Sequence, residues 1–153
     1  MCDEPASLRV AANRKWTLRL QIALQATVAI ESAVELACDY VKQRKLFGKQ
    51  LFDFQNTQFT LAECKTQAVV ARRFVDALMV DLIAGTLEPE TAAMAKLWTT
   101  ETQGRVIDAC LQLFGGFGYV TEYPIARLYA DARVTRIFGG TSEVMKLIIS
   151  RTL

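Results

Sequence analysis

The chain has no histidine among its 153 residues, so candidate chemistry has to come from its carboxylate, lysine, tyrosine and cysteine side chains. Without histidine, a Ser-His-Asp triad and a Cys-His dyad are excluded, and the common zinc sites lack a ligand. The cysteines are widely spaced and form no CxxC pair: Cys2, Cys38, Cys64 and Cys110. We therefore expect no metal site.

The first segment of interest is residues 42–49, Lys-Gln-Arg-Lys-Leu-Phe-Gly-Lys, which holds four positive charges and no negative one. One interpretation is an ordinary helix end, because cations favour the negative end of the helix dipole. The alternative is an anion-binding turn. In that case Arg44 would donate a fork of hydrogen bonds to a phosphate, and Phe47 would pack beside it.

Two glycine-bearing segments are the other candidates. Residues 112–119, Gln-Leu-Phe-Gly-Gly-Phe-Gly-Tyr, contain more glycine than a helix end requires, and their spacing is not that of the dinucleotide-binding fingerprint. Residues 136–143, Arg-Ile-Phe-Gly-Gly-Thr-Ser-Glu, lead into a helix start whose free N–H groups suit an anion or a flavin edge. Each segment alone is also typical of an ordinary helix cap.

These segments lie between predicted helices. Polar residues recur at helical spacing from Gln21 to Asp39, which predicts a first helix from about Asn13 to Lys45. Further helices are expected from a cap at Asp53 or Asn56 to Ala84, from Pro89 to Phe114, from Pro124 to Arg133, and from a cap at Thr141 or Ser142 to the C-terminus. Gly85 is the predicted stop of the second helix.

The predicted fold is all-α, an up-and-down four-helix bundle with a short extra helix. It forms one domain over residues 13–153, behind an irregular or disordered lead-in over 1–12. Wide apolar faces predict a dimer or larger assembly.

Composition excludes several classes of protein. A formal net charge of +2 and 22% charged residues fit neither a disordered chain nor a strongly basic nucleic-acid binder. The longest uncharged run, Ala109 to Thr121, is shorter than the roughly 20 apolar residues of a membrane span. Met1 to Val10 carries early acids and no apolar block, unlike a signal peptide. We expect a soluble, cytoplasmic protein without a membrane span or nucleic-acid partner.

Taken in order, six motifs resemble the C-terminal helical domain of acyl-CoA dehydrogenases. The resemblance extends from about Leu18 to Leu153. The motifs are Tyr40-Val-Lys-Gln-Arg-Lys-Leu-Phe-Gly-Lys, Gln55, Leu111-Gln-Leu-Phe-Gly-Gly-Phe-Gly-Tyr119, Glu122-Tyr-Pro124, Asp131-Ala-Arg133 and Phe138-Gly-Gly-Thr-Ser-Glu143. In that family this domain ends a longer chain, behind a helical and a β domain. It packs into dimers and tetramers, with FAD between domains and across a subunit interface.

The resemblance implies roles for individual residues. The implied FAD contacts are Arg44, Phe47, Gln55, Gln112, Gly115, Gly116, Thr141 and Glu143. Of these, Arg44 would lie near the pyrophosphate, Gln112 and the glycine pair would line the adenine end of a partner subunit's FAD, and Thr141 and Glu143 would hold the chain's own FAD. Arg19, Gly139 and Gly140 would lie on the acyl-CoA substrate side.

The family removes the α-proton of an acyl-CoA thioester with a glutamate and passes the β-hydrogen as hydride to the flavin. Most members carry that glutamate at the position of Gly139, and the long-chain and isovaleryl types carry it at the position of Leu18. Arg19 matches the family, but neither base position holds an acid. For the carboxylates of Glu31, Glu35 and Glu143 we favour structural or cofactor-binding roles, so no catalytic residue is assigned.

Three functions remain open. The chain is expected to be the FAD-binding and oligomerisation domain of an acyl-CoA dehydrogenase, inactive alone and assembled as a homodimer or homotetramer. The alternative is a non-catalytic structural subunit of a heteromeric enzyme, bound to a second acyl-CoA dehydrogenase chain. A helical interaction module without a cofactor would require all three segments to be mere caps. Similar domains occur in acyl-CoA oxidases and nitroalkane oxidases.

Overall fold

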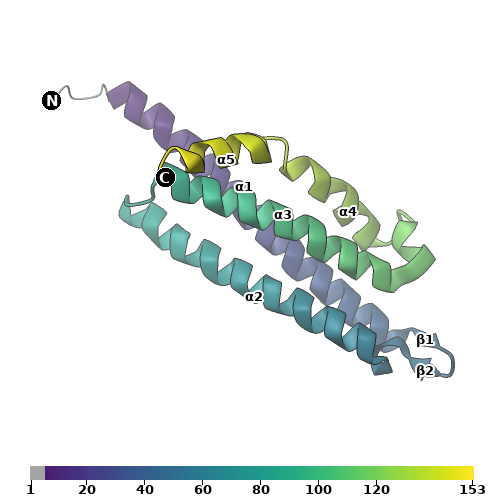
Figure 1. Ribbon diagram of the computed structural model, residues 1–153. Coiled ribbons are helices and arrows are strands. Elements are labelled where there is room, and N and C mark those ends of the chain that lie inside the picture. Colours follow the sequence, from purple (N-terminus) through teal and green to yellow (C-terminus); the bar gives the residue numbers. More distant parts are fainter. Residues whose placement is uncertain (1–5) are drawn as a thin grey trace.

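The computed structural model describes residues 6–153 of the chain, with side chains from Lys15 onward, and shows a bundle of long helices (Figure 1). Its elements in chain order are α1 (Ala6–Gln43), β1 (Lys45–Leu46), β2 (Lys49–Gln50), the 3-10 helix η1 (Leu51–Asp53), α2 (Gln55–Ala84), α3 (Pro89–Phe114), the 3-10 helix η2 (Gly115–Tyr119), α4 (Pro124–Thr135) and α5 (Ser142–Ser150). The all-α prediction is confirmed.

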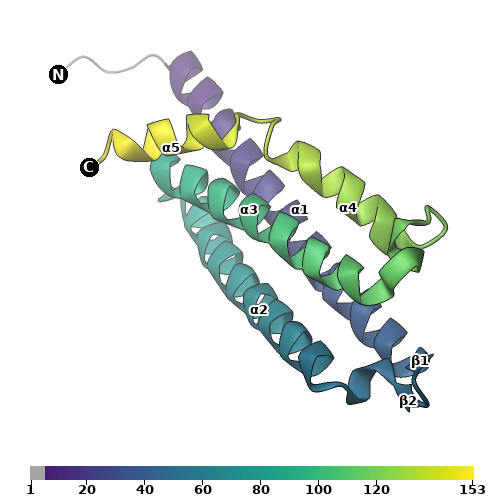
Figure 2. The same cartoon turned by 45° about the vertical axis from the view of Figure 1, so that its right-hand side comes forward.

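Helices α1 to α4 run alternately up and down, and α5 lies across the end of the bundle where α1 begins (Figures 1 and 2). α3 packs against each of the other four helices. Many positions in the interior are small side chains, including Ala33 and Ala37 of α1, Ala71 of α2, and Ala92 and Ala95 of α3, all fully buried. Small residues let helix backbones approach closely, and larger side chains such as Leu20, Ile30 and Ile107 fill the remaining space.

Most predicted helix ends are confirmed. Gly85 ends α2 with a positive φ of 74°, and its N–H bonds back to the last turn. Pro89 opens α3, whose helical run stops at Phe114 as expected. The Thr141 hydroxyl accepts a hydrogen bond from the backbone N–H of Val144, so Thr141 is the cap of α5.

Two predicted helix starts are corrected. α2 begins after Phe54, which makes no side-chain cap, rather than after Asp53 or Asn56. The Asp53 carboxylate is already used inside η1, where it accepts from the Gln50 N–H at 3.0 Å. α1 begins at Ala6 and so includes residues 6–12, for which an irregular lead-in was expected. Residues 1–5, which include Cys2, lie outside the described residues.

α1 is also apolar enough to cross a membrane by length and composition, because part of Lys15–Gln43 has a mean hydropathy of 1.2. Half of that stretch is buried inside the bundle. Ile30, Ala33 and Val41 are among its buried residues and belong to the main core cluster, together with residues of α2 and α3. The apolar character of α1 is therefore that of a core helix.

Candidate functional site

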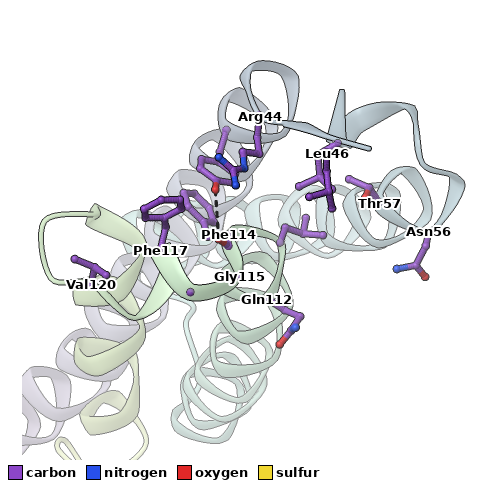
Figure 3. A pocket seen from close by; sticks show the side chains of 13 residues that line it. Arg44, Leu46, Asn56, Thr57, Gln112, Phe114, Gly115, Phe117 and Val120 are labelled. Atoms are coloured by element: carbon purple, nitrogen blue, oxygen red, sulfur yellow. Dashed lines mark hydrogen bonds between the residues drawn. The ribbon is translucent and has the colours of Figure 1, made fainter. Parts of the chain in front are cut away.

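A pocket of about 580 Å³ opens at the end of the bundle that carries the β1–β2 hairpin. Figure 3 shows Arg44, Phe114 and Phe117 on one side of it, and Leu46 and Thr57 on the other. Of the residues predicted to bind FAD, four line this pocket: Arg44, Gln112, Gly115 and Gly116. The first two predicted segments, about 70 residues apart in the chain, therefore meet in one place.

Aromatic side chains fix the position of Arg44 at the pocket. The rings of Tyr40 and Phe114 stack with their centroids 4.1 Å apart, and the Tyr40 hydroxyl donates to the Phe114 carbonyl at 3.3 Å. The Arg44 guanidinium lies over the Phe117 ring, 5.5 Å from its centroid. Among the described residues no carboxylate forms an ion pair with Arg44, so its charge is available to an anion.

The electrostatics of Tyr40 agree with its role as a hydrogen-bond donor. Burial raises the pKa of its hydroxyl, and the nearby Arg44 opposes this in part. The phenol therefore stays protonated at neutral pH and keeps the end of α3 attached to α1. This attachment holds Phe114, and with it the start of the glycine pair, against the α1 terminus.

Two other predicted residues do not reach this pocket. Phe47 lies at the tip of the hairpin with a positive φ of 52°, and its side chain is 86% exposed. Gln55 is the exposed first residue of α2. In a single chain both face solvent, so their FAD contacts remain predictions.

The third predicted segment forms a separate corner between α4 and α5. Thr141 and Glu143 line a smaller pocket of about 280 Å³ there, together with Glu101 and Arg136. Backbone N–H donation at the start of α5 lowers the pKa of the Glu143 carboxyl, assisted by the Thr141 hydroxyl. Gly139 and Gly140 precede this corner with φ values of 66° and 102°.

The two predicted base positions, Leu18 and Gly139, both lie close to Ile22 of α1. A Cβ on Gly139 would come within 2.4 Å of the Ile22 Cδ1. Leu18 precedes Ile22 by one helical turn, so the two side chains share a face of α1. Leu18 is 47% exposed, and burial lowers the pKa of the neighbouring Arg19. A carboxylate at position 18 would thus lie close to the Gly139 turn, whereas a side chain at position 139 would overlap Ile22.

The sequence did not single out Lys96, which is fully buried beneath this corner. A usable signal exists, because Lys96 lies on the same helical face as Ala92, Thr99, Thr100 and Gln103, all of which are small or uncharged. Glu31 has the structural role expected for it, since it accepts two hydrogen bonds from Arg72 of α2. No group of metal-ligating side chains is present among the described residues.

The two pockets lie at different levels of α3. Glu101, which lines the pocket of the α5 corner, and Phe114, which lines the Arg44 pocket, are about 20 Å apart along the helix. Figures 1 and 2 show the same separation between α5 and the β1–β2 hairpin. The three segments therefore do not converge within one chain.

The acyl-CoA dehydrogenase, C-terminal domain, family matches residues 8–153. The chain belongs to this family. A curated member, the pig (Sus scrofa) long-chain specific acyl-CoA dehydrogenase, mitochondrial, is 49% identical over 135 residues, which cover 88% of the chain and 31% of the relative. The chain thus spans about a third of the length of such acyl-CoA dehydrogenases.

Solved acyl-CoA dehydrogenase structures agree with this assignment. The Megasphaera elsdenii butyryl-CoA dehydrogenase matches with a TM-score of 0.91 and 35% identity, over 98% of the chain and 39% of that protein. The Geobacillus kaustophilus acyl-CoA dehydrogenase matches with a TM-score of 0.88 and 43% identity, over 90% and 36%.

Two further matches are to proteins whose names state a bound cofactor or a complex. A Mycobacterium smegmatis glutaryl-CoA dehydrogenase in complex with FADH2 is 26% identical with a TM-score of 0.83, covering 88% of the chain and 35% of that protein. A subunit of the Acetobacterium woodii caffeyl-CoA reductase-Etf complex is 36% identical over 138 residues, covering 88% of the chain and 36% of the relative.

Proposed function

We propose that the chain is the FAD-binding and oligomerisation domain of a flavin-dependent acyl-CoA dehydrogenase, which oxidises an acyl-CoA thioester between its α and β carbons. The observation that carries the proposal is the pocket lined by Arg44, Gln112 and the glycine pair, in which no carboxylate of the described residues forms an ion pair with Arg44. The relative solved with FADH2 supports FAD as the bound group. When bound, FAD would accept the hydride from the substrate.

The residues of the Arg44 pocket fit the phosphate and adenine parts of such a cofactor. The Arg44 guanidinium can donate two parallel hydrogen bonds to a phosphate. Nothing lies within 4 Å of where a Cβ would stand on Gly115 or Gly116, so a ligand can approach the backbone there. Phe47 of the hairpin and Gln55 of α2 would add contacts on one side, and Thr141 and Glu143 would add contacts from the α5 corner.

The same proposal assigns no catalytic base to this chain. Leu18 and Gly139 stand at the two base positions, and loss of a positioned base typically lowers the rate about 10² to 10⁴-fold. Arg19, Gly139 and Gly140 would face the acyl-CoA. We expect no acyl-CoA oxidation by this polypeptide alone.

The empty base positions favour a second candidate function, a non-catalytic subunit that supports a catalytic acyl-CoA dehydrogenase chain. Assembly is supported by large apolar side chains exposed along α2, namely Phe59, Val69, Val70, Val80 and Ile83. We expect a homodimer or homotetramer, or an assembly with a second chain of the family. A monomer by light scattering at micromolar concentration would contradict this.

FAD titration of the purified chain tests the cofactor assignment. Arg44→Gln should weaken FAD binding about tenfold or more, because a hydrogen bond to a charged group is removed. Arg73→Gln is the matched control, since Arg73 is an exposed arginine on α2 away from both pockets. Equal affinity of both variants would contradict the role of Arg44. If the chain alone binds no FAD but forms a yellow complex with a related full-length chain, the subunit function is favoured.

The base assignment has its own test. In a chain that also carries the upstream domains, Leu18→Glu should raise acyl-CoA oxidation, because Leu18 is partly exposed and a carboxylate fits there. Failure to raise the rate would show that position 18 is not the base position.

The cytoplasmic location stays a prediction, and the name of the pig relative places that protein in mitochondria.

A further inference from the structure

Lys96 is a buried lysine that contacts both ends of the connection between α4 and α5. Its side chain is 0% exposed. Its Nζ donates to the carbonyl of Thr135 at 3.1 Å and to the carbonyl of Gly140 at 2.7 Å. A Cβ on Gly139 would lie 3.5 Å from the Lys96 Cε, so the lysine stem also supports the turn from below.

Neither carbonyl group has a partner within a helix, because Thr135 ends α4 and Gly140 lies in the connection before α5. Thr135 is the last residue of α4, and the last carbonyls of a helix have no partner within it. They also form the negative end of the helix dipole, which favours a cation. Burial lowers the pKa of Lys96, the nearby Arg19 lowers it further, and Glu101 opposes this in part. The two carbonyls therefore offset part of the cost of burying the ammonium group.

Other side chains of α3 hold the same connection at neighbouring points. Glu101 accepts from the Ser142 hydroxyl and from Arg136, both at 2.7 Å. Gln103 accepts from the Thr135 hydroxyl at 2.9 Å. Lys96 differs from these two because it bonds to the glycine pair itself. The conformation of that pair sets where Thr141 and the start of α5 lie.

We infer that Lys96 is a positioning residue that fixes the Gly139–Gly140–Thr141 turn for cofactor binding. This inference rests on the proposed function, in which Thr141 contacts FAD. Lys96 acts through the turn, because a fully buried side chain cannot touch the cofactor. Removal of the ammonium group leaves the Thr135 and Gly140 carbonyls without this donor, so it should loosen the turn. The packing of α1 against α2 involves neither carbonyl and should be kept.

Hydrogen exchange of the chain with Lys96→Met tests whether the turn loosens while the rest of the bundle stays protected. The amides of Phe138, Ser142 and Met145 are hydrogen-bonded in or beside the turn, so they report its opening. We expect these amides to exchange about ten to a hundred times faster, the factor that loss of a charge-assisted hydrogen bond gives. Amides in the core of α1 and α2 should keep their protection. Lys146→Met, which removes an exposed lysine of α5, should leave the turn unchanged.

Two outcomes would overturn the inference. A similar rise in exchange throughout the chain would mean that Lys96 serves overall stability only. Unchanged exchange in the turn would mean that its two hydrogen bonds do not hold it. Should Lys96→Met fail to fold, ¹⁵N NMR of the unaltered chain decides: a slowly exchanging Lys96 ammonium signal supports the inference, and rapid exchange with water contradicts it.

FAD titration then separates this inference from the proposed function. If the unaltered chain binds FAD, Lys96→Met should weaken binding about tenfold, and unchanged affinity would refute positioning for cofactor binding. If the unaltered chain binds no FAD, the proposed cofactor contact of this chain fails. The exchange experiment still decides whether Lys96 holds the turn.

Discussion

Gly139 is expected to tolerate no side chain while Ile22 faces it. The residue has a φ of 66°, which L side chains rarely adopt, and its Cβ position lies 2.4 Å from the Ile22 Cδ1. The next neighbours, Lys96 Cε at 3.5 Å and Ile22 Cγ1 at 3.9 Å, are at ordinary contact distances. The overlap of Gly139→Ala therefore involves one terminal methyl group, and Ile22→Val removes that methyl.

The magnitudes separate into two parts. A left-handed backbone costs a non-glycine residue about 1–2 kcal/mol. The overlap with Ile22 adds about 1–3 kcal/mol, as overpacking of a tight interior does. Gly139→Ala should thus destabilise the chain by about 2–5 kcal/mol, a large part of the ~5–15 kcal/mol of a typical domain. Ile22→Val alone costs about 0.5–1.5 kcal/mol. In the Ile22→Val background, Gly139→Ala should add only the cost of about 1–2 kcal/mol for the left-handed backbone.

Urea unfolding of the four chains of this double-mutant cycle measures the coupling. We expect Gly139→Ala and Ile22→Val to show a favourable interaction of about 1–3 kcal/mol. If Gly139→Ala costs the same in both backgrounds, Ile22 does not restrict position 139 and the reasoning is refuted. A cost below about 1 kcal/mol in both would also refute the backbone part.

Two further predictions concern other contacts. Gly118→Ala should destabilise the chain by about 1–3 kcal/mol in urea unfolding, because its Cβ would lie 2.7 Å from the Leu111 carbonyl oxygen. Gly116→Ala is the control. Because the space around Gly116 is open, this substitution should change stability by about 0.5 kcal/mol or less. The hydrogen bond from Arg72 holds the pKa of Glu31 below its ordinary value. The stability that the ionised Glu31 contributes is therefore present above about pH 4.5, and it is lost as the pH falls through the folded-state pKa. The unfolding free energy of Glu31→Gln should therefore decline less than that of the unaltered chain between about pH 5 and pH 3, and equal declines would contradict the assignment.

The helix ends that could be predicted are those fixed by local chemistry. Gly85 ends α2 and Pro89 opens α3 because positive φ and a missing N–H are properties of the residue itself. Asp53 failed as a cap because two local structures compete for its carboxylate, and η1 obtains it. Its residue type allows either outcome, so only the three-dimensional path of the chain decides.

The site could be predicted in its parts but not in its arrangement. Arg44, Gln112 and the glycine pair were identified from motifs, and packing of α1 against α3 brings them together. Lys96 was missed because lysine is rarely buried without a partner. Its partners are the main-chain carbonyls of Thr135 and Gly140. Every residue has a main-chain carbonyl, so these partners cannot be identified from residue types.

The separation of the two corners follows from the length of α4. This helix returns beside α3 for 12 residues, or about 18 Å, and so brings the Gly139 turn back to the level of Lys96. One chain therefore presents Arg44 and Thr141 at well-separated levels of the bundle, and no single phosphate or ring can contact both. Under the proposed function, the Arg44 pocket serves a cofactor held by a second copy. Cofactor binding and assembly are then linked equilibria, so dissociation of the assembly should also weaken FAD binding at Arg44.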